Sequence, residues 1–314
     1  MTRIAVIGGG LMGHGIALTF ARAGHGVSVV DPAPEMLESV PARVAESLAL
    51  LGAEQAEIDA ALARLTLCPS LPDAVAAADV VFEAAPEKLE LKQAIFAEIE
   101  GHAPSQAILA SNTSVIQISK IMGGLETRHR ALGTHWWNPP HMIPLVEVVK
   151  TEWTDPALAR AMFDLLAGAG KTPVMVEKDV PGFIGNRLQH ALWREAVSLV
   201  ENGICSAKAV DDVVKASFGR RLAVLGPLEN ADLVGIELTQ DIHKQVLFDL
   251  DARPAPSPYL QELRDRGRTG MAVGAGFRDW ENGDLAATKE RVADHLRKLE
   301  AILPDGSGHM GGET

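Results

Sequence analysis

Cysteine is scarce in this chain of 314 residues, which has only Cys68 and Cys205. The two lie far apart and form no CxxC pair, so we expect neither a disulfide framework nor a bound metal. Long apolar runs are also lacking, since none approaches the ~20 residues needed to cross a bilayer. No signal-peptide pattern opens the chain. These absences predict a cytoplasmic protein without a membrane partner.

Positive charge is in short supply as well. The chain carries 29 Lys and Arg against 41 Asp and Glu, a formal net charge of −12. Nucleic acids and anionic lipids are bound through clustered basic side chains, so neither is an expected partner. The hydrophobic content of 47% is enough to fill the cores of two domains. Chemistry on a small molecule is the best expectation.

The first 180 or so residues alternate short apolar runs with amphipathic stretches, as βαβ units do. Runs such as VVFEAA and LVEVV are too continuously apolar for a half-solvated antiparallel sheet, which indicates strands covered on both faces. The sequence therefore predicts an α/β fold, with a Rossmann-type, mostly parallel, doubly wound sheet. The expected strands are 3–8, 26–31, 79–84, 107–111, 130–136, 145–150 and 172–177, and the expected helices are 11–24, 34–63 with a break near Gly52, 87–100 and 155–169.

Helical periodicity replaces the strand pattern after residues 177–187. We expect the α/β domain to span 1–181 and an all-helical C-terminal domain to span 182–304. The Gly-rich end, 305–314, is expected to be a flexible tail.

The stretch GGGLMG at 8–13 fits the pattern G-x-G-x-x-G. It follows a predicted strand and opens a predicted helix, and Asp31 ends the next strand, which is the context of a dinucleotide site. The glycines allow a tight turn, close approach of the diphosphate and close packing of helix on strand. A carboxylate at Asp31 accepts ribose hydroxyls and repels a 2′-phosphate, so NAD is favoured over NADP. The expected cofactor residues are Gly8, Gly10, Leu11, Met12, Gly13 and Asp31.

With these features the chain resembles the NAD-dependent L-3-hydroxyacyl-CoA dehydrogenases and their relatives that act on small free 3-hydroxy acids. The resemblance rests on seven stretches in the same order, namely GGGLMGHGIA (8–17), FEAAPEKLELK (82–92), SNTSVIQI (111–118), GTHWWNPPHMIPLVEVV (133–149), DVPGFIGNRL (179–188), GPLENADLVG (226–235) and GMAVGAGF (270–277). It implies an oxidoreductase, of the kind found in fatty acid metabolism, that forms a homodimer through its helical domain.

The resemblance also implies roles for individual residues. His135 matches the catalytic base and Glu147 its partner, while Ser114 and Asn186 match residues that contact the substrate oxygen. The further cofactor-side residues that it implies are Glu87, Lys92, Asn112, Ser114 and Asn138.

The chemistry of alcohol oxidation suits the first pair. Removal of a hydroxyl proton needs a base with a pKa near neutrality, such as imidazole, and a carboxylate behind it fixes the tautomer. His135 and Glu147 can meet if they stand on neighbouring strands joined by the turn Asn138-Pro139-Pro140. Ser114 and Asn186 would then stabilise charge on the substrate oxygen.

Three features depart from the family members that use coenzyme A. Residues 32–65 contain six acids but only Arg43 and Arg64, although the polyanionic end of coenzyme A is usually met by lysines there. Trp136 and Trp137 stand where two smaller aromatics are common, so both are candidates for shaping the acyl channel. Arg194, in LWREA, is a candidate partner for a substrate carboxylate, although a surface ion pair would explain it equally well.

The sequence thus predicts a dehydrogenase that transfers hydride between NAD and the 3-hydroxyl of an acyl substrate, with 3-hydroxyacyl-CoA as the first substrate class. The alternative is a small free 3-hydroxy compound, as in the carnitine, gulonate and vitamin B6-breakdown dehydrogenases. A catalytically silent, crystallin-like NAD-binding protein is a third reading, which the intact candidate residues argue against.

Overall fold

The computed structural model describes residues 1–303, and the expected tail at 305–314 lies outside them. The chain divides into two compact units, residues 1–187 and residues 188–303. No helix in the described part of the chain is long and apolar enough to cross a membrane.

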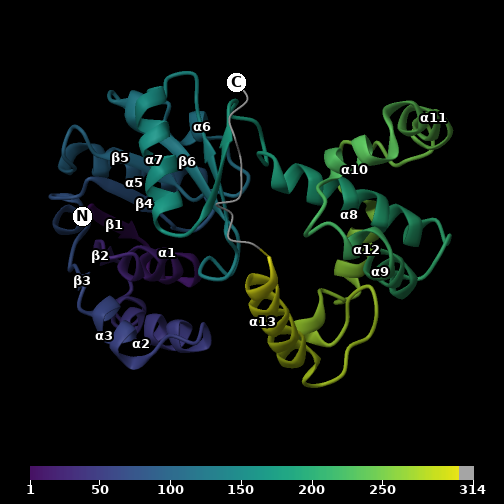
Figure 1. Ribbon diagram of the computed structural model, residues 1–314, viewed down its shortest axis with the longest axis horizontal. Helices are drawn as coiled ribbons and strands as arrows, with labels where there is room; N and C mark the ends of the chain where they lie inside the picture. Colours follow the sequence, from purple (N-terminus) through teal and green to yellow (C-terminus); the bar gives the residue numbers. More distant parts are fainter. Residues whose placement is uncertain (304–314) are drawn as a thin grey trace. The chain divides into compact units, whose positions relative to one another are not determined.

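An eight-stranded sheet forms the centre of the first unit (Figure 1). Its strands are β1 Arg3–Ile7, β2 Gly26–Val30, β3 Leu65–Leu67, β4 Val80–Glu83, β5 Ile108–Ser111, β6 Ala131–Trp136, β7 Leu145–Val149 and β8 Thr172–Val176. In space they follow the order β3-β2-β1-β4-β5-β6-β7-β8, and every neighbouring pair is parallel except β6 and β7. The prediction of a mostly parallel sheet is confirmed.

Helices cover both faces of this sheet. They are α1 Leu11–Arg22, α2 Pro34–Leu50, α3 Gln55–Leu62, α4 Leu71–Val75, α5 Leu89–His102, α6 Ile118–Met122 and α7 Pro156–Gly168. Alternate residues of each strand point to opposite faces. In β1, Ile4 and Val6 join a core with α1, α2 and α7, whereas Ala5 and Ile7 join a second core with α4, α5 and α6.

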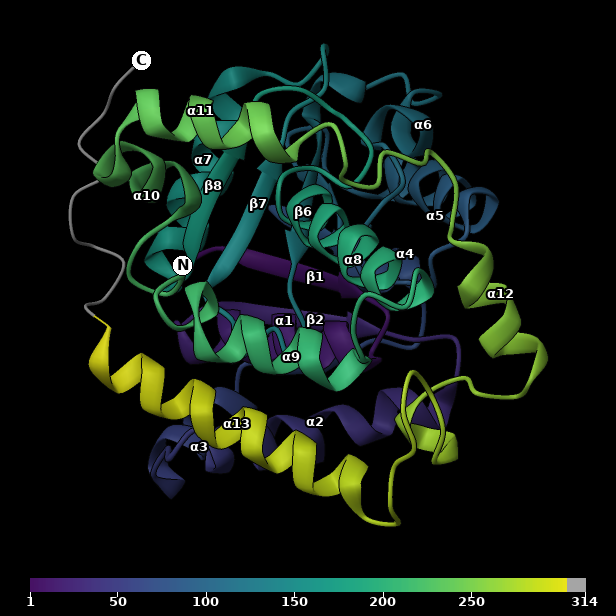
Figure 2. The same cartoon turned by 90° about the vertical axis from the view of Figure 1, so that its right-hand side faces the viewer.

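The sheet is strongly twisted, so that β7 and β8 run almost crosswise to β1 and β2 in Figure 2. Such a twist is the normal result of the right-handed preference of each strand. The carboxyl ends of β1, β4 and β5 lie at one edge of the parallel part, where ligands of doubly wound sheets bind.

Each expected strand is present to within about two residues, and the expected long helix is broken at Gly52, which has φ of 82°. The structure adds β3, α4 and α6, which the sequence did not predict. These elements have three to five residues each, too few to show a period of 2 or 3.6.

The second unit is helical, as predicted, and is entered through α8 Gly185–Glu201, whose first three residues still belong to the first unit. Its other helices are α9 Ala207–Ala216, α10 Pro227–Val234, α11 Ile236–Val246, α12 Pro258–Asp265 and α13 Asp284–Ile302. Two isolated β-bridges join Ala275 to Gly270 and to Asp279, and no strand runs through the described part of this unit.

The aromatic centre of the first core gives a test of packing. Phe20 is fully buried, and its ring lies 4.9 Å from that of Phe82 and 5.9 Å from that of Trp136. We expect Phe20→Ala to lower the free energy of unfolding by about 3–5 kcal/mol, because it removes a large side chain from a packed site. Leu50→Ala, at a side chain that is 60% exposed, should change it by less than about 0.5 kcal/mol. Urea unfolding followed by circular dichroism measures both, and equal losses would contradict this account of the core.

Candidate active site

The antiparallel pairing of β6 and β7 sets His135 directly opposite Glu147. Residues opposite each other in such a pair carry their side chains on the same face of the sheet. The Nδ1 atom of His135 lies 2.7 Å from Oε2 of Glu147, and both side chains are buried. The turn with Asn138-Pro139-Pro140 makes the two strands a hairpin, as the sequence predicted.

The second oxygen of Glu147 is held by the start of α8. Its Oε1 atom accepts hydrogen bonds from the backbone N–H groups of Ile184, at 2.8 Å, and Gly185, at 3.0 Å. Burial raises the pKa of Glu147, but the hydrogen bonds from His135, Gly185 and Ile184 outweigh it and keep the pKa below its ordinary value. Glu147 is therefore ionised at neutral pH. Because a carboxylate can only accept a hydrogen bond, the Nδ1 atom of His135 carries the proton that is donated to Glu147.

Phe183 precedes these amides and has a positive φ of 50°, unusual for a residue with a side chain. Its ring is buried 5.7 Å from the ring of His135. Such strained backbone persists only where the surroundings fix it, and here it presents two N–H groups to Glu147.

A cavity of about 310 Å³ lies in front of His135. It lies within the first unit and is lined by residues from the first turn of α1, the loops after β4 and β5, the end of β6 with the turn that follows it, and the start of α8. The residues that line it are Met12, Ala84, Ala85, Glu87, Asn112, Ser114, His135, Trp136, Trp137, Asn138 and Asn186. The structure thus brings together eight of the predicted site residues around His135, from five separate stretches of the chain.

The loop that carries Ser114 is fixed from two directions. Oε1 of Glu87 accepts hydrogen bonds from the hydroxyl of Thr113, at 2.5 Å, and from the N–H groups of Ser114 and Val115. From the other side, the carboxamide of Asn186 donates to the carbonyl oxygen of Ser114 at 2.8 Å. Asn112 links this loop to β6, because its Oδ1 accepts the N–H of Trp136.

The loop from Gly8 to Gly13 fits the diphosphate of a dinucleotide. Gly8 has φ of 101°, and a Cβ atom on Gly13 would lie 1.7 Å from the carbonyl oxygen of Gly8, so both positions require glycine. At Gly10, where α1 begins, a Cβ atom would meet nothing within 4 Å. The first turn of α1 has neither a side-chain cap nor an acidic residue, which leaves its N–H groups to an anion.

Asp31 borders the same loop. Its Oδ2 accepts the N–H of Gly9 at 2.8 Å and its Oδ1 accepts the N–H of Ala33 at 2.9 Å. These bonds hold the carboxylate in place beside the glycine loop while leaving it acceptor capacity, since each oxygen has two lone pairs. The arrangement suits the hydroxyls of a ribose. Leu11 stands at the first position of α1 and is 57% exposed, outside the cavity lining.

The two tryptophans differ in position. The indole of Trp136 packs against Phe20 and Phe82, and the residue is only 2% exposed. Its side chain is therefore part of the hydrophobic core on one face of the sheet. The ring of Trp137 lies 5.3 Å from that of His135, and a Cβ atom at Gly185 would meet it at 2.4 Å. Trp137 is therefore the better candidate for limiting the size of a substrate, and Gly185 leaves room for it.

Lys92 lies behind the cavity wall. It is fully buried, and its Nζ atom donates to Oε1 of Glu83 at 2.7 Å and to the carbonyl oxygen of Ala85 at 3.2 Å. Oε2 of Glu87 is 3.4 Å away. Lys92 is thus connected to the cavity lining through Glu87 and Ala85 and does not line the cavity itself.

His14 and His141, whose rings lie 5.9 Å apart, are outside the cavity lining. Burial lowers the pKa of His141 to about 4, with His14 and Lys171 adding to the effect. His141 is therefore uncharged and weakly basic at neutral pH, which leaves His135 as the candidate base.

The sequence did not identify Glu83, Phe183 or the inward-facing Arg43 as parts of this region. Glu83 had a signal, since it is the one acid in the apolar run VVFEAA. Phe183 and Arg43 had none, because backbone conformation and the direction of a long side chain are not written in composition or spacing.

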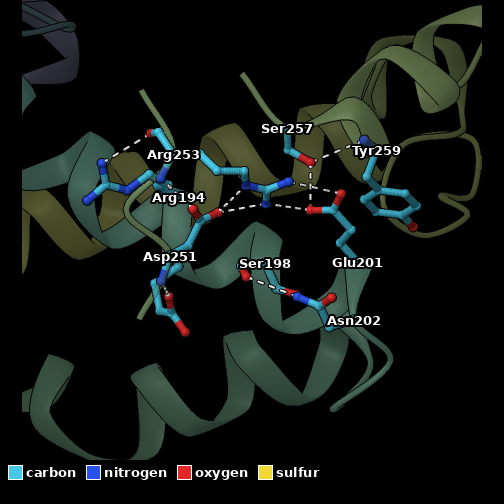
Figure 3. Close-up of polar contacts among 9 residues, drawn as sticks. Arg194, Ser198, Glu201, Asn202, Asp251, Arg253, Ser257 and Tyr259 are labelled. Carbon is cyan, nitrogen blue, oxygen red and sulfur yellow. Dashed lines mark hydrogen bonds and ion pairs between the residues drawn. The ribbon is translucent and has the colours of Figure 1, made fainter. Parts of the chain in front are cut away.

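Arg194 lies in the second unit, in α8, where it is exposed (Figure 3). Its guanidinium donates to the backbone oxygen of Arg253 at 3.4 Å. Arg253 is in turn paired with Glu201 and Asp251. A role for Arg194 in holding a substrate carboxylate stays a prediction.

Comparison with known proteins shows the family to which both parts of the chain are similar. The family model of the 3-hydroxyacyl-CoA dehydrogenase NAD binding domain matches residues 3–180, and that of the 3-hydroxyacyl-CoA dehydrogenase C-terminal domain matches residues 182–280.

Individual relatives fall into two substrate groups. The chain is 34% identical to 5-formyl-3-hydroxy-2-methylpyridine 4-carboxylate 5-dehydrogenase of Mesorhizobium japonicum, over 95% of this chain and 96% of the relative. It is 39% identical to L-carnitine dehydrogenase of Streptomyces griseus, over 75% of this chain and 70% of the relative. The crystal structure of (S)-3-hydroxybutyryl-CoA dehydrogenase from Ralstonia eutropha superposes with a TM-score of 0.76 and 31% identity, covering 90% of this chain and all of that one, 100%.

The geometry at the glycine loop generates a binding test. We expect Asp31→Ala to raise the dissociation constant for NAD roughly 10- to 100-fold, because it removes a charged hydrogen-bond acceptor for the ribose. Asp59→Ala, at an exposed acid of α3, is the matched control and should leave the constant unchanged. Isothermal titration with NAD alone measures both, and equal affinities in the two variants would refute the assignment of Asp31.

Proposed function

We propose, starting from the fact that this chain belongs to the 3-hydroxyacyl-CoA dehydrogenase family, that it oxidises the secondary hydroxyl of a small free hydroxy acid. The coarser part of this statement is settled by membership: the chain is an NAD-dependent dehydrogenase that acts on a hydroxyl group. The presence of His135, Glu147, Ser114 and Asn186 speaks against a catalytically silent, crystallin-like protein.

His135 is proposed as the base. With Nδ1 bonded to the ionised Glu147, the lone pair of the ring is on Nε2, which is the atom that takes the hydroxyl proton. NAD, when bound, would supply the acceptor for the hydride that leaves the carbon bearing this hydroxyl, so that the alcohol becomes a carbonyl group. Glu147 then faces the imidazolium and stabilises it, and its two backbone N–H partners keep it from turning away.

Ser114 and Asn186 are proposed to bind the reacting oxygen. Both line the cavity with His135, and the bond between the Asn186 carboxamide and the Ser114 carbonyl oxygen fixes one relative to the other. Donors held in advance stabilise the charge that develops on the oxygen without reorganising. In this proposal Asn112 and Asn138, which also line the cavity, help to shape the cofactor side.

The choice of a free substrate rests on one observation about residues 32–65. The only cations there, Arg43 and Arg64, are directed into the protein. Arg43 donates to the carbonyl oxygen of Gly9 at 2.7 Å and contacts His14, and Arg64 donates to the carbonyl oxygens of Ala21 and Ala60. Their acidic neighbours, of which Glu57 pairs with Arg22, give this segment a surface that repels the phosphates of coenzyme A.

Two relatives support the same choice, since the names of the Mesorhizobium and Streptomyces enzymes specify free compounds with a carboxylate or a carnitine group. A 3-hydroxyacyl-CoA thioester is the second candidate, favoured by the likeness to the Ralstonia structure. The bulk of Trp137 beside His135 favours the smaller substrate.

We also propose that the chain forms a homodimer through its second unit. In the described chain none of the helices α8, α9, α10 and α11 has a buried residue. Many of their apolar side chains are more than half exposed, among them Val213, Leu233 and Ile236. Apolar surface of this extent is characteristic of an interface that a partner covers.

The substrate class can be tested by measuring NADH formation with 3-hydroxybutyryl-CoA and with a panel of free hydroxy acids, including cationic, sugar and pyridine carboxylic acids. We expect kcat/KM for at least one free acid to exceed that for the thioester by about 10-fold or more, because only the thioester has to meet the acidic segment. Activity confined to the thioester would reject the free-acid proposal and favour the second candidate.

The role of His135 can be tested in the same assay. His135→Gln should lower kcat about 10²- to 10⁴-fold, because glutamine cannot take up the proton, while the dissociation constant for NAD stays within a few-fold. The exposed His102, replaced in the same way, is the matched control. Near-normal turnover of the His135 variant would remove it as the base.

A further inference from the structure

A cluster of three charged side chains lies at the carboxyl end of β4, outside the catalytic pair. Glu83 and Lys92 are both fully buried, with 2.7 Å between Oε1 and Nζ, and Glu87 stands 3.4 Å from the same Nζ atom. We call Glu83, Lys92 and Glu87 the charged triad.

The hydrogen bonds of the triad assign its charges. Glu83 accepts from the Nζ atom of Lys92, from the N–H of Ala85 at 2.7 Å and from the hydroxyl of Ser111 at 2.6 Å, which is the environment of a carboxylate. The Nζ atom of Lys92 donates to Glu83 and to the carbonyl oxygen of Ala85, and it forms an ion pair with Glu87, which is the environment of an ammonium. Two carboxylates and one ammonium leave one net negative charge.

Glu87 is the member of the triad whose carboxylate lies at the cavity. Burial raises its pKa, but the hydrogen bond from Thr113, the charge of Lys92 and the bonds from Val115 and Ser114 together keep the pKa below its ordinary value. Glu87 and Ala85 line the cavity together with His135, and the side chain of Glu87 is 36% exposed.

The negative charge of the triad would act on the part of the cofactor that enters the cavity. This step rests on the proposed function. The proton and the hydride leave adjacent atoms of one substrate, so the ring that takes the hydride has to share the cavity with His135. That ring is cationic in oxidised NAD and uncharged in the reduced form. A fixed negative charge in the wall attracts the first and is indifferent to the second.

We propose that the charged triad sets the redox preference of the cofactor site, by making the chain bind oxidised NAD more tightly relative to reduced NAD than a neutral wall would. Glu83 is the positioning residue of this device. Without it, Lys92 and Glu87 would form a neutral pair and the bias would be lost. The other carboxylate near the cavity, Glu147, is the same in every variant of this comparison and cancels from it.

The test is the ratio of two dissociation constants measured without substrate, by isothermal titration for oxidised NAD and by cofactor fluorescence for reduced NAD. Glu83→Gln keeps the shape of the side chain and removes one charge. We expect the ratio of the dissociation constant for oxidised NAD to that for reduced NAD to rise on the order of 3- to 30-fold, the effect of one charge beside the cavity in a partly polar medium. An unchanged ratio, or equal loss of both affinities, would overturn the proposal.

Two further variants keep this test decisive. Ser111→Ala removes a hydrogen bond from Glu83 without changing charge, and its ratio should stay within about twofold of the parent. Glu87→Gln removes the same unit of charge from a partly exposed position and should raise the ratio in the same direction, so it decides the matter if the Glu83 variant does not fold. Because no substrate is present, a failure to find turnover would bear on the proposed function and leave this result standing.

Discussion

The buried carboxylate of Glu147 is the interaction on which the candidate site depends. One oxygen holds His135 across the hairpin of β6 and β7, and the other holds the first N–H groups of α8. A single buried charge thus joins two strands to the helix that carries Asn186. Its three hydrogen bonds together compensate a charge that would be costly to bury without partners. The proposed catalytic role of Glu147 and its role in holding the fold together thus depend on the same carboxylate.

Much of the fold could be predicted because its signals are local and strong. Seven of the eight strands can be recognised in the sequence as apolar runs. The glycine loop can be recognised by the spacing of its glycines between a strand and a helix. The eighth, β3, pairs at the sheet edge with only three residues, so its formation depends on β2 rather than on its own sequence. The reversal of β7 within a parallel sheet likewise depends on the whole arrangement, although the turn before it was visible.

The sequence predicted which residues gather at the candidate site better than it predicted which of their side chains line the cavity and which are buried behind it. His135, Ser114 and Asn186 come together as expected, but Lys92 stands a layer behind the cavity and the indole of Trp136 belongs to the core. A motif assigns a residue to a neighbourhood; whether its side chain faces solvent, ligand or core is decided by packing. Arg43 illustrates the same limit. From the sequence alone it would be taken for a surface charge, but its guanidinium donates a hydrogen bond to the carbonyl oxygen of Gly9.

The pairing of β6 with β7 also limits how this chain can change over time. Side chains alternate between faces with a period of two, so a slip of one residue in the pairing of β7 with β6 would carry Glu147 to the opposite face of the sheet. The turn itself has a second task, because Trp137 and Asn138 line the cavity. A relative can therefore keep both His135 and Glu147 and still lose their contact, if the register of its hairpin has slipped by one residue.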